Sequence, residues 1–366
     1  MIALFRNTLM AALLTVLYLP LMAQQKYPGN YVDAASLTIV GKSMATANTY
    51  DRADTGKYNG LPARVKQLLT NTAGVAICFT TNSTSISAKW CVTQSKPYPN
   101  LTPIANKGLD LYIKKDGKWQ AAGIGKPTGV CSEGMLVEQM DNREKECILY
   151  LPIYDAVRKM EIGVDTKAFI KAGQLPLKNR ILIYGSSIVQ GSGASRSGMA
   201  YPAQLSRFTG INFINLGLSG SAKMEPEVAD MVAAIDADAY VLDCVPNSSP
   251  AQITARTSYL VHQIRKAHPA APIIVMQSIV REQGYFNEKV GETVKNQNIN
   301  IQKEVLRLLE KGMEHLYFIT SEQLIGSDHE GSVDGTHPND LGYYRMTQQL
   351  APQLVDILKK HGIANN

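Results

Sequence analysis

The chain contains 366 residues, of which 45% are hydrophobic and 19% are charged, and its formal net charge is +6 at pH 7. These values are ordinary for a globular protein with one large domain or two of average size. The 37 lysines and arginines form no concentrated basic run, so the charge does not favour nucleic acid as a partner.

The first 23 residues have the features of a secretory signal peptide. Arg6 supplies a positive charge, residues 10–21 are almost wholly apolar, and cleavage is expected after Ala23. The alternative is a membrane anchor, for which this apolar run is short. No later segment is apolar enough to span a bilayer, so we expect an exported protein, periplasmic or secreted, without a membrane span after cleavage.

Residues 24–174 are expected to form a domain of β-strands. Apolar and polar residues alternate at 75–79 and again at 86–92, and this pattern predicts two strands joined as a hairpin. Asp116 and Gly117 predict a second, tight hairpin, because glycine accepts the positive φ of such a turn. The remaining predicted strands lie at 109–113, 119–121, 146–151 and 159–164. Many short strands with little helix are typical of a β-sandwich or jelly roll.

The number of cysteines is odd, so at least one of them is unpaired. They match no metal-binding spacing, and we expect most of them to be buried as small apolar side chains. The one disulfide that we consider is Cys78–Cys91. The five residues are Cys78, Cys91, Cys131, Cys147 and Cys244.

In residues 179–366, strands and helices are expected to alternate. A clear helix is predicted over 294–309 with a stop at Gly312, and a last helix follows Asp340. This alternation predicts an open, doubly wound parallel sheet of the α/β class, in which ligands bind at the carboxyl ends of the strands. The predicted strands are short apolar runs suited to a buried parallel sheet, at 181–184, 211–216, 239–244, 272–277 and 316–320.

A serine, a histidine and an aspartate lie at this predicted edge of the sheet. Ser187 follows the first parallel strand, and Asp334 and His337 share a loop before the last helix. A serine hydroxyl becomes a good nucleophile when an imidazole takes its proton, and a carboxylate fixes the tautomer of that imidazole. The alternatives are that Ser187 only caps a helix, and that the nearby His329 is the base.

Two more strand ends offer hydrogen-bond donors. Gly220 follows the second strand and can present a backbone N–H, and Asn247 follows the third and can donate from its amide. Each alone is also an ordinary turn signal. Together, four strand ends carry the parts of one reaction, acyl transfer by a serine nucleophile. No cluster of His, Cys and carboxylate has ligand spacing, so neither a metal nor an organic cofactor is expected.

These segments resemble the four blocks of the SGNH (GDSL-type) hydrolase superfamily, which are defined by serine, glycine, asparagine and histidine. Residues 108–112, Gly-Leu-Asp-Leu-Tyr, also resemble the Gly-x-Asp-Leu-Tyr motif of a small β domain that precedes such hydrolases. The four similar segments are, in order, 185–188, 218–220, Asn247 and 334–338.

The resemblance implies a flavodoxin-like sheet and a role for each matched residue. Ser187 would be the nucleophile and His337 the base, oriented by Asp334. Gly220, Asn247 and the Ser187 N–H would form the oxyanion hole.

Two departures from the superfamily pattern lie close to these residues. Ser186 stands where the superfamily has the aspartate of Gly-Asp-Ser-Leu. Residues 245–248, Val-Pro-Asn-Ser, replace Gly-x-Asn-Asp, so the glycine and the last aspartate are missing.

The resemblance further implies a serine esterase that works through an acyl-enzyme. Within the superfamily, a protein that is exported and carries an accessory β domain resembles the carbohydrate esterases. We therefore expect its substrates to be short-chain, chiefly acetyl, esters of a small molecule or polysaccharide. Arg196, in a polar segment beside the nucleophile, is a candidate for contacts with sugar hydroxyls, or else a solvated surface residue. The alternatives are a lipid or aryl esterase for longer acyl chains, and a non-catalytic glycan-binding protein.

Overall fold

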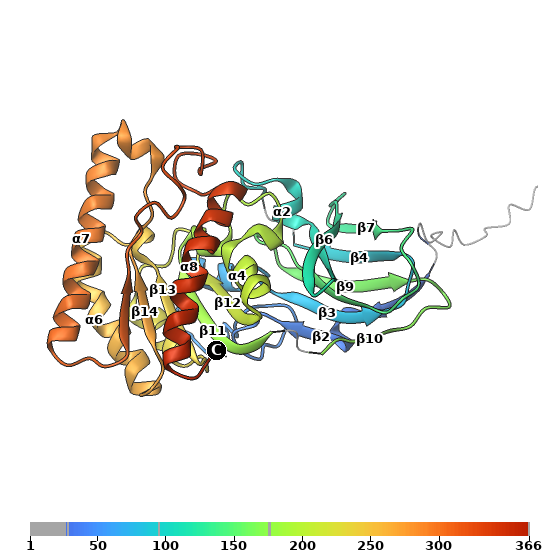
Figure 1. Ribbon diagram of the computed structural model, residues 1–366, viewed down its shortest axis with the longest axis horizontal. Helices are drawn as coiled ribbons and strands as arrows, with labels where there is room; N and C mark the ends of the chain where they lie inside the picture. Colours follow the sequence, from blue (N-terminus) through green and yellow to red (C-terminus); the bar gives the residue numbers. More distant parts are fainter. Residues whose placement is uncertain (1–26, 28, 94–95, 175–176, 365–366) are drawn as a thin grey trace, which may run out of the picture.

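The structure is a computed structural model that describes residues 27, 29–93, 96–174 and 177–364. The expected signal peptide, with its cleavage site after Ala23, lies outside these residues. Figure 1 shows two parts side by side along the long axis, one made of β-strands and the other of a sheet flanked by helices. The domain boundaries expected from the sequence, at 24–174 and 179–366, remain a prediction.

The β-strand part contains two antiparallel sheets, which confirms the expected β-sandwich class. Its strands are β1 (Asn30–Asp33), β2 (Thr38–Val40), β3 (Ala76–Thr81), β4 (Ile86–Val92), β5 (Leu109–Lys115), β6 (Lys118–Gly125), β7 (Cys131–Val137), β8 (Lys145–Tyr150), β9 (Val157–Val164) and β10 (Ile170–Ala172). One sheet has the order β1-β9-β4-β7, and the other has the order β10-β3-β8-β5-β6, with β2 also paired to β3. Side chains from both sheets meet in one buried cluster that includes Trp90, Leu111 and Leu149.

One of the two predicted hairpins is confirmed and the other is wrong. β5 and β6 pair around Asp116 and Gly117, which have φ values of 50° and 75°. β3 and β4 do not pair, because they belong to different sheets. Their connection crosses between the sheets, and Asp165 accepts hydrogen bonds there from the Thr84 backbone and side chain, each at 2.7 Å. Alternating polarity predicts which face of a strand is buried, but not which strand lies beside it.

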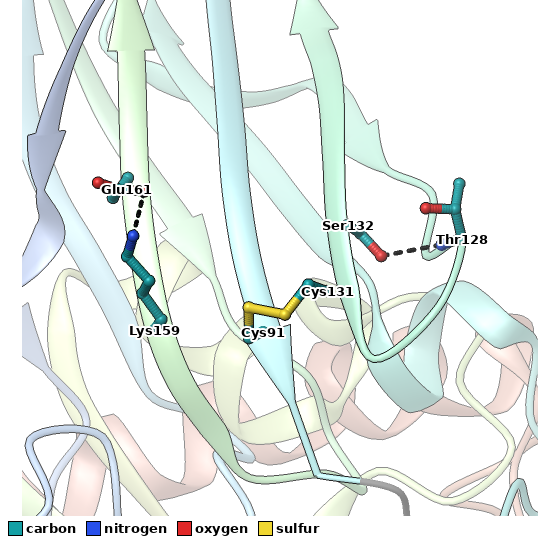
Figure 2. The surroundings of a disulfide bond; sticks show 6 residues. All are labelled: Cys91, Thr128, Cys131, Ser132, Lys159 and Glu161. Atoms are coloured by element: carbon teal, nitrogen blue, oxygen red, sulfur yellow. Dashed lines mark hydrogen bonds and ion pairs between the residues drawn. A yellow bond between two sulfur atoms is a disulfide. The ribbon is translucent and has the colours of Figure 1, made fainter. Parts of the chain in front are cut away.

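The β-strand part also holds a disulfide bond, between Cys91 of β4 and Cys131 of β7 (Figure 2). The two residues lie directly opposite each other in the strand register, with Cα atoms 4.0 Å apart. The Cys78–Cys91 bridge that we considered is therefore wrong, because Cys91 is bonded to Cys131 and Cys78 is unpaired. Cys78, Cys147 and Cys244 are unpaired and buried, as expected for small apolar side chains.

The second part is built on a parallel sheet, as predicted. Its strands are β11 (Lys178–Gly185), β12 (Ile211–Gly217), β13 (Ala239–Asp243), β14 (Ile273–Met276) and β15 (Leu316–Ile319). Their order is β12-β11-β13-β14-β15, which is the flavodoxin-like order 2-1-3-4-5. In such sheets the ligand site lies where the strand order reverses, which here is at the carboxyl ends of β11 and β13.

Helices cover both faces of this sheet. The helices are α1 (Ala63–Leu69), α2 (Pro103–Lys107), α3 (Ser187–Gln190), α4 (Tyr201–Thr209), α5 (Pro226–Ala233), α6 (Pro250–Ala267), α7 (Glu288–Glu310) and α8 (Asp340–Lys360). Leu182 and Tyr184 of β11 pack with α1, α5, α6 and α7, whereas Ile181 and Ile183 pack with α4 and α8. Because α1 precedes the β-sandwich strands β3–β10 in sequence, the N-terminal half of the chain contributes to the core of the parallel sheet.

Candidate active site

The turn after β11 brings Ser187 to the carboxyl edge of the sheet. Ser187 is the first residue of α3 and is 8% exposed. The helix cap is the preceding residue, Ser186, whose hydroxyl accepts a hydrogen bond from the Ile188 N–H at 3.2 Å. Serine replaces the superfamily aspartate there without loss of the cap, because both residue types are good N-caps. Gly185 is needed at this turn, since a Cβ atom would lie 2.3 Å from Val189 and 2.4 Å from the Asp243 carbonyl oxygen.

Ser187, His337 and Asp334 are brought together in a hydrogen-bonded chain. The Ser187 Oγ lies 2.9 Å from His337 Nε2, and His337 Nδ1 lies 2.7 Å from Asp334 Oδ2. A carboxylate can only accept, so Nδ1 carries the proton and Nε2 is left free to accept from the serine hydroxyl. This is the tautomer that a general base for Ser187 requires.

The loop of Asp334 and His337 is fixed largely by Asp334 itself. Its Oδ1 accepts hydrogen bonds from the Thr336 N–H at 3.0 Å and the His337 N–H at 2.8 Å. Partial burial raises the pKa of Asp334, but the backbone and side-chain hydrogen bonds from His337 outweigh it and hold the pKa below the usual range. The carboxylate therefore stays ionised beside the imidazole at neutral pH.

His329, the alternative base, lies elsewhere on the surface. Its Nδ1 is 2.8 Å from Glu282 Oε2, and its side chain is 59% exposed. No hydrogen bond joins it to Ser187. Of the two histidines, His337 is the one that the fold places on the serine.

Three hydrogen-bond donors at neighbouring strand ends have no partner within the described part of the chain. They are the backbone N–H groups of Ser187 and Gly220 and the side-chain amide nitrogen of Asn247. The Asn247 Oδ1 accepts from the Ala222 N–H at 3.4 Å, which leaves the NH₂ end of the amide free to donate. Gly220 is exposed and has a φ of 68°, a conformation that favours glycine. Unpartnered donors beside a nucleophile are what an oxyanion hole requires.

Two side chains hold the loop of Asn247 in place of the missing superfamily residues. Arg281 donates to the Pro246 carbonyl at 2.7 Å, and Gln297 donates to the Ser248 carbonyl at 2.7 Å. Neither contact was predicted, because both come from segments more than 30 residues further along the chain.

Asn100 is a further residue that sequence reasoning missed. It lies between β4 and α2, in the β-strand half, and its side-chain nitrogen is 2.9 Å from Ser192 Oγ and 3.0 Å from Asp334 Oδ2. The flanking sequence has no strand or helix periodicity, so no signal in the chain pointed to it.

Arg196, the candidate for sugar contacts, is bound to the aspartate and the tyrosine of the Gly-x-Asp-Leu-Tyr motif. Its Nη1 lies 2.9 and 2.8 Å from the two Asp110 carboxylate oxygens and 2.5 Å from the Tyr112 hydroxyl, and its Nη2 contacts Met199 Sδ at 3.4 Å. It is therefore not a solvated surface arginine, because its Nη1 group is occupied by Asp110 and Tyr112.

Two features are absent from the part of the chain that the structure describes. No group of three or more His, Cys, Asp or Glu side chains among its residues is placed to hold a metal ion. None of the described helices combines the length and apolar character needed to cross a membrane.

Comparison with known families matches both halves of the chain. Residues 178–355 match the GDSL-like lipase/acylhydrolase family, and residues 29–170 match the N-terminus of SGNH hydro-type esterases. Among solved structures, a protein from Bacteroides ovatus ATCC 8483 described as a GDSL-like lipase is 55% identical, with a TM-score of 0.89 over 90% of this chain and 98% of that chain. No curated protein matches the chain in sequence.

More distant structures share the fold. The salicylyl-acyltransferase SsfX3 from a tetracycline biosynthetic pathway is 20% identical, with a TM-score of 0.74 over 90% of this chain and 97% of that one. The acetyl xylan esterase Est2A from the rumen bacterium Butyrivibrio proteoclasticus is 12% identical, with a TM-score of 0.57 over 90% of this chain and 99% of that one. On the evidence of its two family matches and its Bacteroides relative, the chain belongs to the GDSL-like lipase/acylhydrolase family of SGNH hydrolases and carries that family's Gly-x-Asp-Leu-Tyr N-terminal domain.

Proposed function

We propose that the protein is an exported serine esterase that removes short acyl groups, chiefly acetyl, from carbohydrates. The observation that carries this proposal is the chain Ser187–His337–Asp334, with hydrogen bonds of 2.9 and 2.7 Å, beside three unpartnered donors. An inert glycan-binding protein has no need for a serine and a histidine held at proton-transfer distance in the tautomer of a general base.

The first half of the proposed reaction forms an acyl-enzyme. Ser187 Oγ attacks the ester carbonyl carbon while His337 Nε2 takes its proton, and Asp334 stabilises the imidazolium that results. The carbonyl oxygen becomes an oxyanion, which accepts hydrogen bonds from the Ser187 N–H, the Gly220 N–H and the Asn247 amide. Collapse of this intermediate breaks the ester bond, and the leaving alcohol takes the proton from His337.

The second half of the reaction releases the acid. Water attacks the acyl-serine while His337 takes one of its protons, and a second oxyanion forms in the same hole. When this intermediate collapses, Ser187 leaves and recovers its proton from His337. The products are the free alcohol and a carboxylic acid, and the enzyme returns to its starting state.

The substrate class is supported by the neighbours. The fold is that of an acetyl xylan esterase and of family two carbohydrate esterases. Export is supported by the signal-like N-terminus and by the Cys91–Cys131 disulfide, since disulfides persist mainly in oxidising compartments.

The test of the mechanism is Ser187→Ala together with labelling of the active serine. The variant should keep its fold and lose nearly all hydrolysis of p-nitrophenyl acetate, by analogy with other serine hydrolases roughly 10⁶-fold in kcat. A fluorophosphonate probe should label Ser187 and not the neighbouring Ser186, which serves as the internal control. Full activity in the alanine variant, or labelling at Ser186, would refute the assignment.

The test of the substrate compares two kinds of ester. Acetate release from acetylated xylan and other acetylated glycans should be measured beside cleavage of p-nitrophenyl esters from C2 to C12. We expect acetate release and a preference for C2. An optimum at C8 or longer, with no acetate released from any glycan, would favour a lipid or aryl esterase instead.

A further inference from the structure

The β-strand half of the chain places one side chain directly on the proposed triad. The Asn100 side-chain nitrogen lies 3.0 Å from Asp334 Oδ2, 2.9 Å from Ser192 Oγ and 3.3 Å from His337 Nδ1. Asn100 and Asp334 are 234 residues apart in the sequence. These contacts are on the Nδ1 side of the imidazole, away from Ser187 and from the place where an ester would bind.

The donors and acceptors around Asn100 allow one arrangement. His337 Nδ1 already donates to Asp334 Oδ2, so the 3.3 Å approach of Asn100 to Nδ1 joins two donors and is not a hydrogen bond. The two hydrogens of the Asn100 amide therefore go to the two remaining acceptors, Asp334 Oδ2 and Ser192 Oγ. The reversed amide would set its oxygen against the Asp334 carboxylate, acceptor against acceptor.

The hydrogen bond from Asn100 to Asp334 Oδ2 completes the set of hydrogen bonds that hold the Asp334 carboxylate. Among the described residues, its other hydrogen bonds come from Thr336 and His337, which belong to its own loop. The Asp334 side chain is 31% exposed, so its own loop alone would leave it free to shift or to bind water. Asn100 is the one donor in the described part of the chain that reaches it from outside that loop. With it, the carboxylate has four hydrogen bonds, which fixes both oxygens.

Asn100 also links the carboxylate to the nucleophile. Ser192, its second acceptor, is 4% exposed, and the Ser192 N–H donates to the Ser187 carbonyl at 2.9 Å. A single amide thus joins the end of the turn that carries Ser187 to the loop that carries Asp334.

The neighbours of Asn100 hold it in place independently of its side chain. Thr102 Oγ1 donates to the Ser195 carbonyl at 2.5 Å and also caps α2. The Tyr98 ring packs against Tyr154, with centroids 4.5 Å apart. Because these anchors flank Asn100, its amide is preorganised, and its replacement should leave the docking of the segment intact.

We infer that Asn100 is a positioning residue, supplied by the β-strand half, which fixes Asp334 and through it the tautomer and orientation of His337. The inference rests on the proposed Ser187–His337–Asp334 mechanism. It gives the N-terminal half a part in catalysis that does not depend on glycan binding.

The test uses Asn100→Ala and the isosteric Asn100→Asp in the full chain, with p-nitrophenyl acetate as substrate. Asn100→Ala should lower kcat roughly 10- to 100-fold with KM unchanged, the size expected for one hydrogen bond to a charged group. Asn100→Asp should lower kcat further, because the new carboxylate would lie against that of Asp334, and two carboxylates at this distance cannot both ionise freely. The matched control is Asn142→Ala, an exposed asparagine of the same half, which should keep full activity. Thermal unfolding of each variant reports whether it is folded.

A double-mutant cycle separates positioning from general structure. If Asn100 acts through Asp334, adding Asn100→Ala to an Asp334→Ala variant should cause almost no further loss of kcat. An equal loss in both backgrounds, an effect on KM alone, or unchanged kcat in folded Asn100→Ala and Asn100→Asp would overturn the inference. Any of these results, with Ser187→Ala still inactive, leaves the proposed function standing; an active Ser187→Ala removes the proposed function itself.

Discussion

Asp110 of β5 and Arg196, which follows the turn that carries Ser187, form an ion pair that joins the two halves of the molecule. The Arg196 Nη1 lies 2.9 and 2.8 Å from the two carboxylate oxygens, and the Asp110 side chain has no exposed surface. The Gly198 N–H donates to the same carboxylate at 2.8 Å, and Arg207 lies 3.9 Å from the centre of the Tyr112 ring. The aspartate and tyrosine of the Gly-x-Asp-Leu-Tyr motif thus serve to dock the N-terminal domain on the hydrolase.

Asp110→Asn should destabilise the protein more than it impairs the reaction. It leaves the Arg196 guanidinium partly buried without its counter-charge, a change that costs about 3 kcal/mol in buried pairs. Urea unfolding monitored by circular dichroism should show this loss, while kcat falls far less than in Ser187→Ala. Asp141→Asn is the control, because its pair with Arg143 lies on the surface. Equal stability of Asp110→Asn and the wild type would mean that the motif has another purpose.

The parallel strands were predictable because burial leaves a pattern in the sequence, whereas β1, β2, β7 and β10 of the β-strand part were not expected. All five parallel strands were expected within a few residues of their bounds, since both faces of such a strand are covered and its sequence is continuously apolar. The Asp116-Gly117 hairpin was predictable because its turn has a specific residue requirement. The separation of β3 and β4 into different sheets was not predictable, and neither was the pairing of β4 with β7 that brings Cys91 opposite Cys131.

The candidate site was predictable where it depends on strand ends. Parallel strands bring their carboxyl ends to one edge, so Ser187 and Asn247 had to be neighbours once the sheet was correct. Asp334, three residues before His337 in a loop with glycine and proline, then favoured His337 over His329, and the superfamily pattern agreed. Asn100 and Arg281 were not predictable, because each reaches the site from a segment without periodicity, and only the folded chain shows which loops meet.

His337→Ala should abolish esterase activity almost as fully as Ser187→Ala, because no other described imidazole contacts the serine. His329→Ala is the matched control and should keep most of the activity, since its ring pairs with Glu282 at the surface. The kcat values of the two variants with p-nitrophenyl acetate decide which histidine is the base. An inactive His329→Ala beside an active His337→Ala would show that the wrong loop was chosen.

Asp243 should make the stability of the protein depend on pH. It lies at the end of β13, it is 3% exposed, and burial raises its pKa to about 7 despite a hydrogen bond from the Tyr201 hydroxyl at 2.8 Å. The folded state then binds a proton between about pH 4 and pH 7 that the unfolded state releases. Stability should therefore fall as the pH rises through this window, by up to about 4 kcal/mol, and change no further above it.

The measurement for Asp243 is urea unfolding of the wild type and Asp243→Asn at pH 5 and pH 8. The variant cannot lose a proton at this position, so it should lose less stability between the two pH values than the wild type does. Glu292→Gln, which removes an exposed carboxylate, should leave the pH dependence as it is. The same pH dependence in Asp243→Asn and the wild type would show that Asp243 is ionised in the folded state throughout.

Asn247→Ala should lower kcat by roughly 10² to 10³ with little change in KM, because its amide is expected to bind the oxyanion more strongly than the ground-state carbonyl. The amide oxygen is held by the Ala222 N–H at 3.4 Å, so the NH₂ end is the part available to substrate. Arg281→Met tests how the amide is aimed, since Arg281 donates to the carbonyl of the preceding Pro246 at 2.7 Å. It should lower kcat less than Asn247→Ala does, and it should have almost no further effect in an Asn247→Ala background. A rise in KM alone for Asn247→Ala would mean that Asn247 binds substrate and that the oxyanion is stabilised by the Ser187 and Gly220 N–H groups without it.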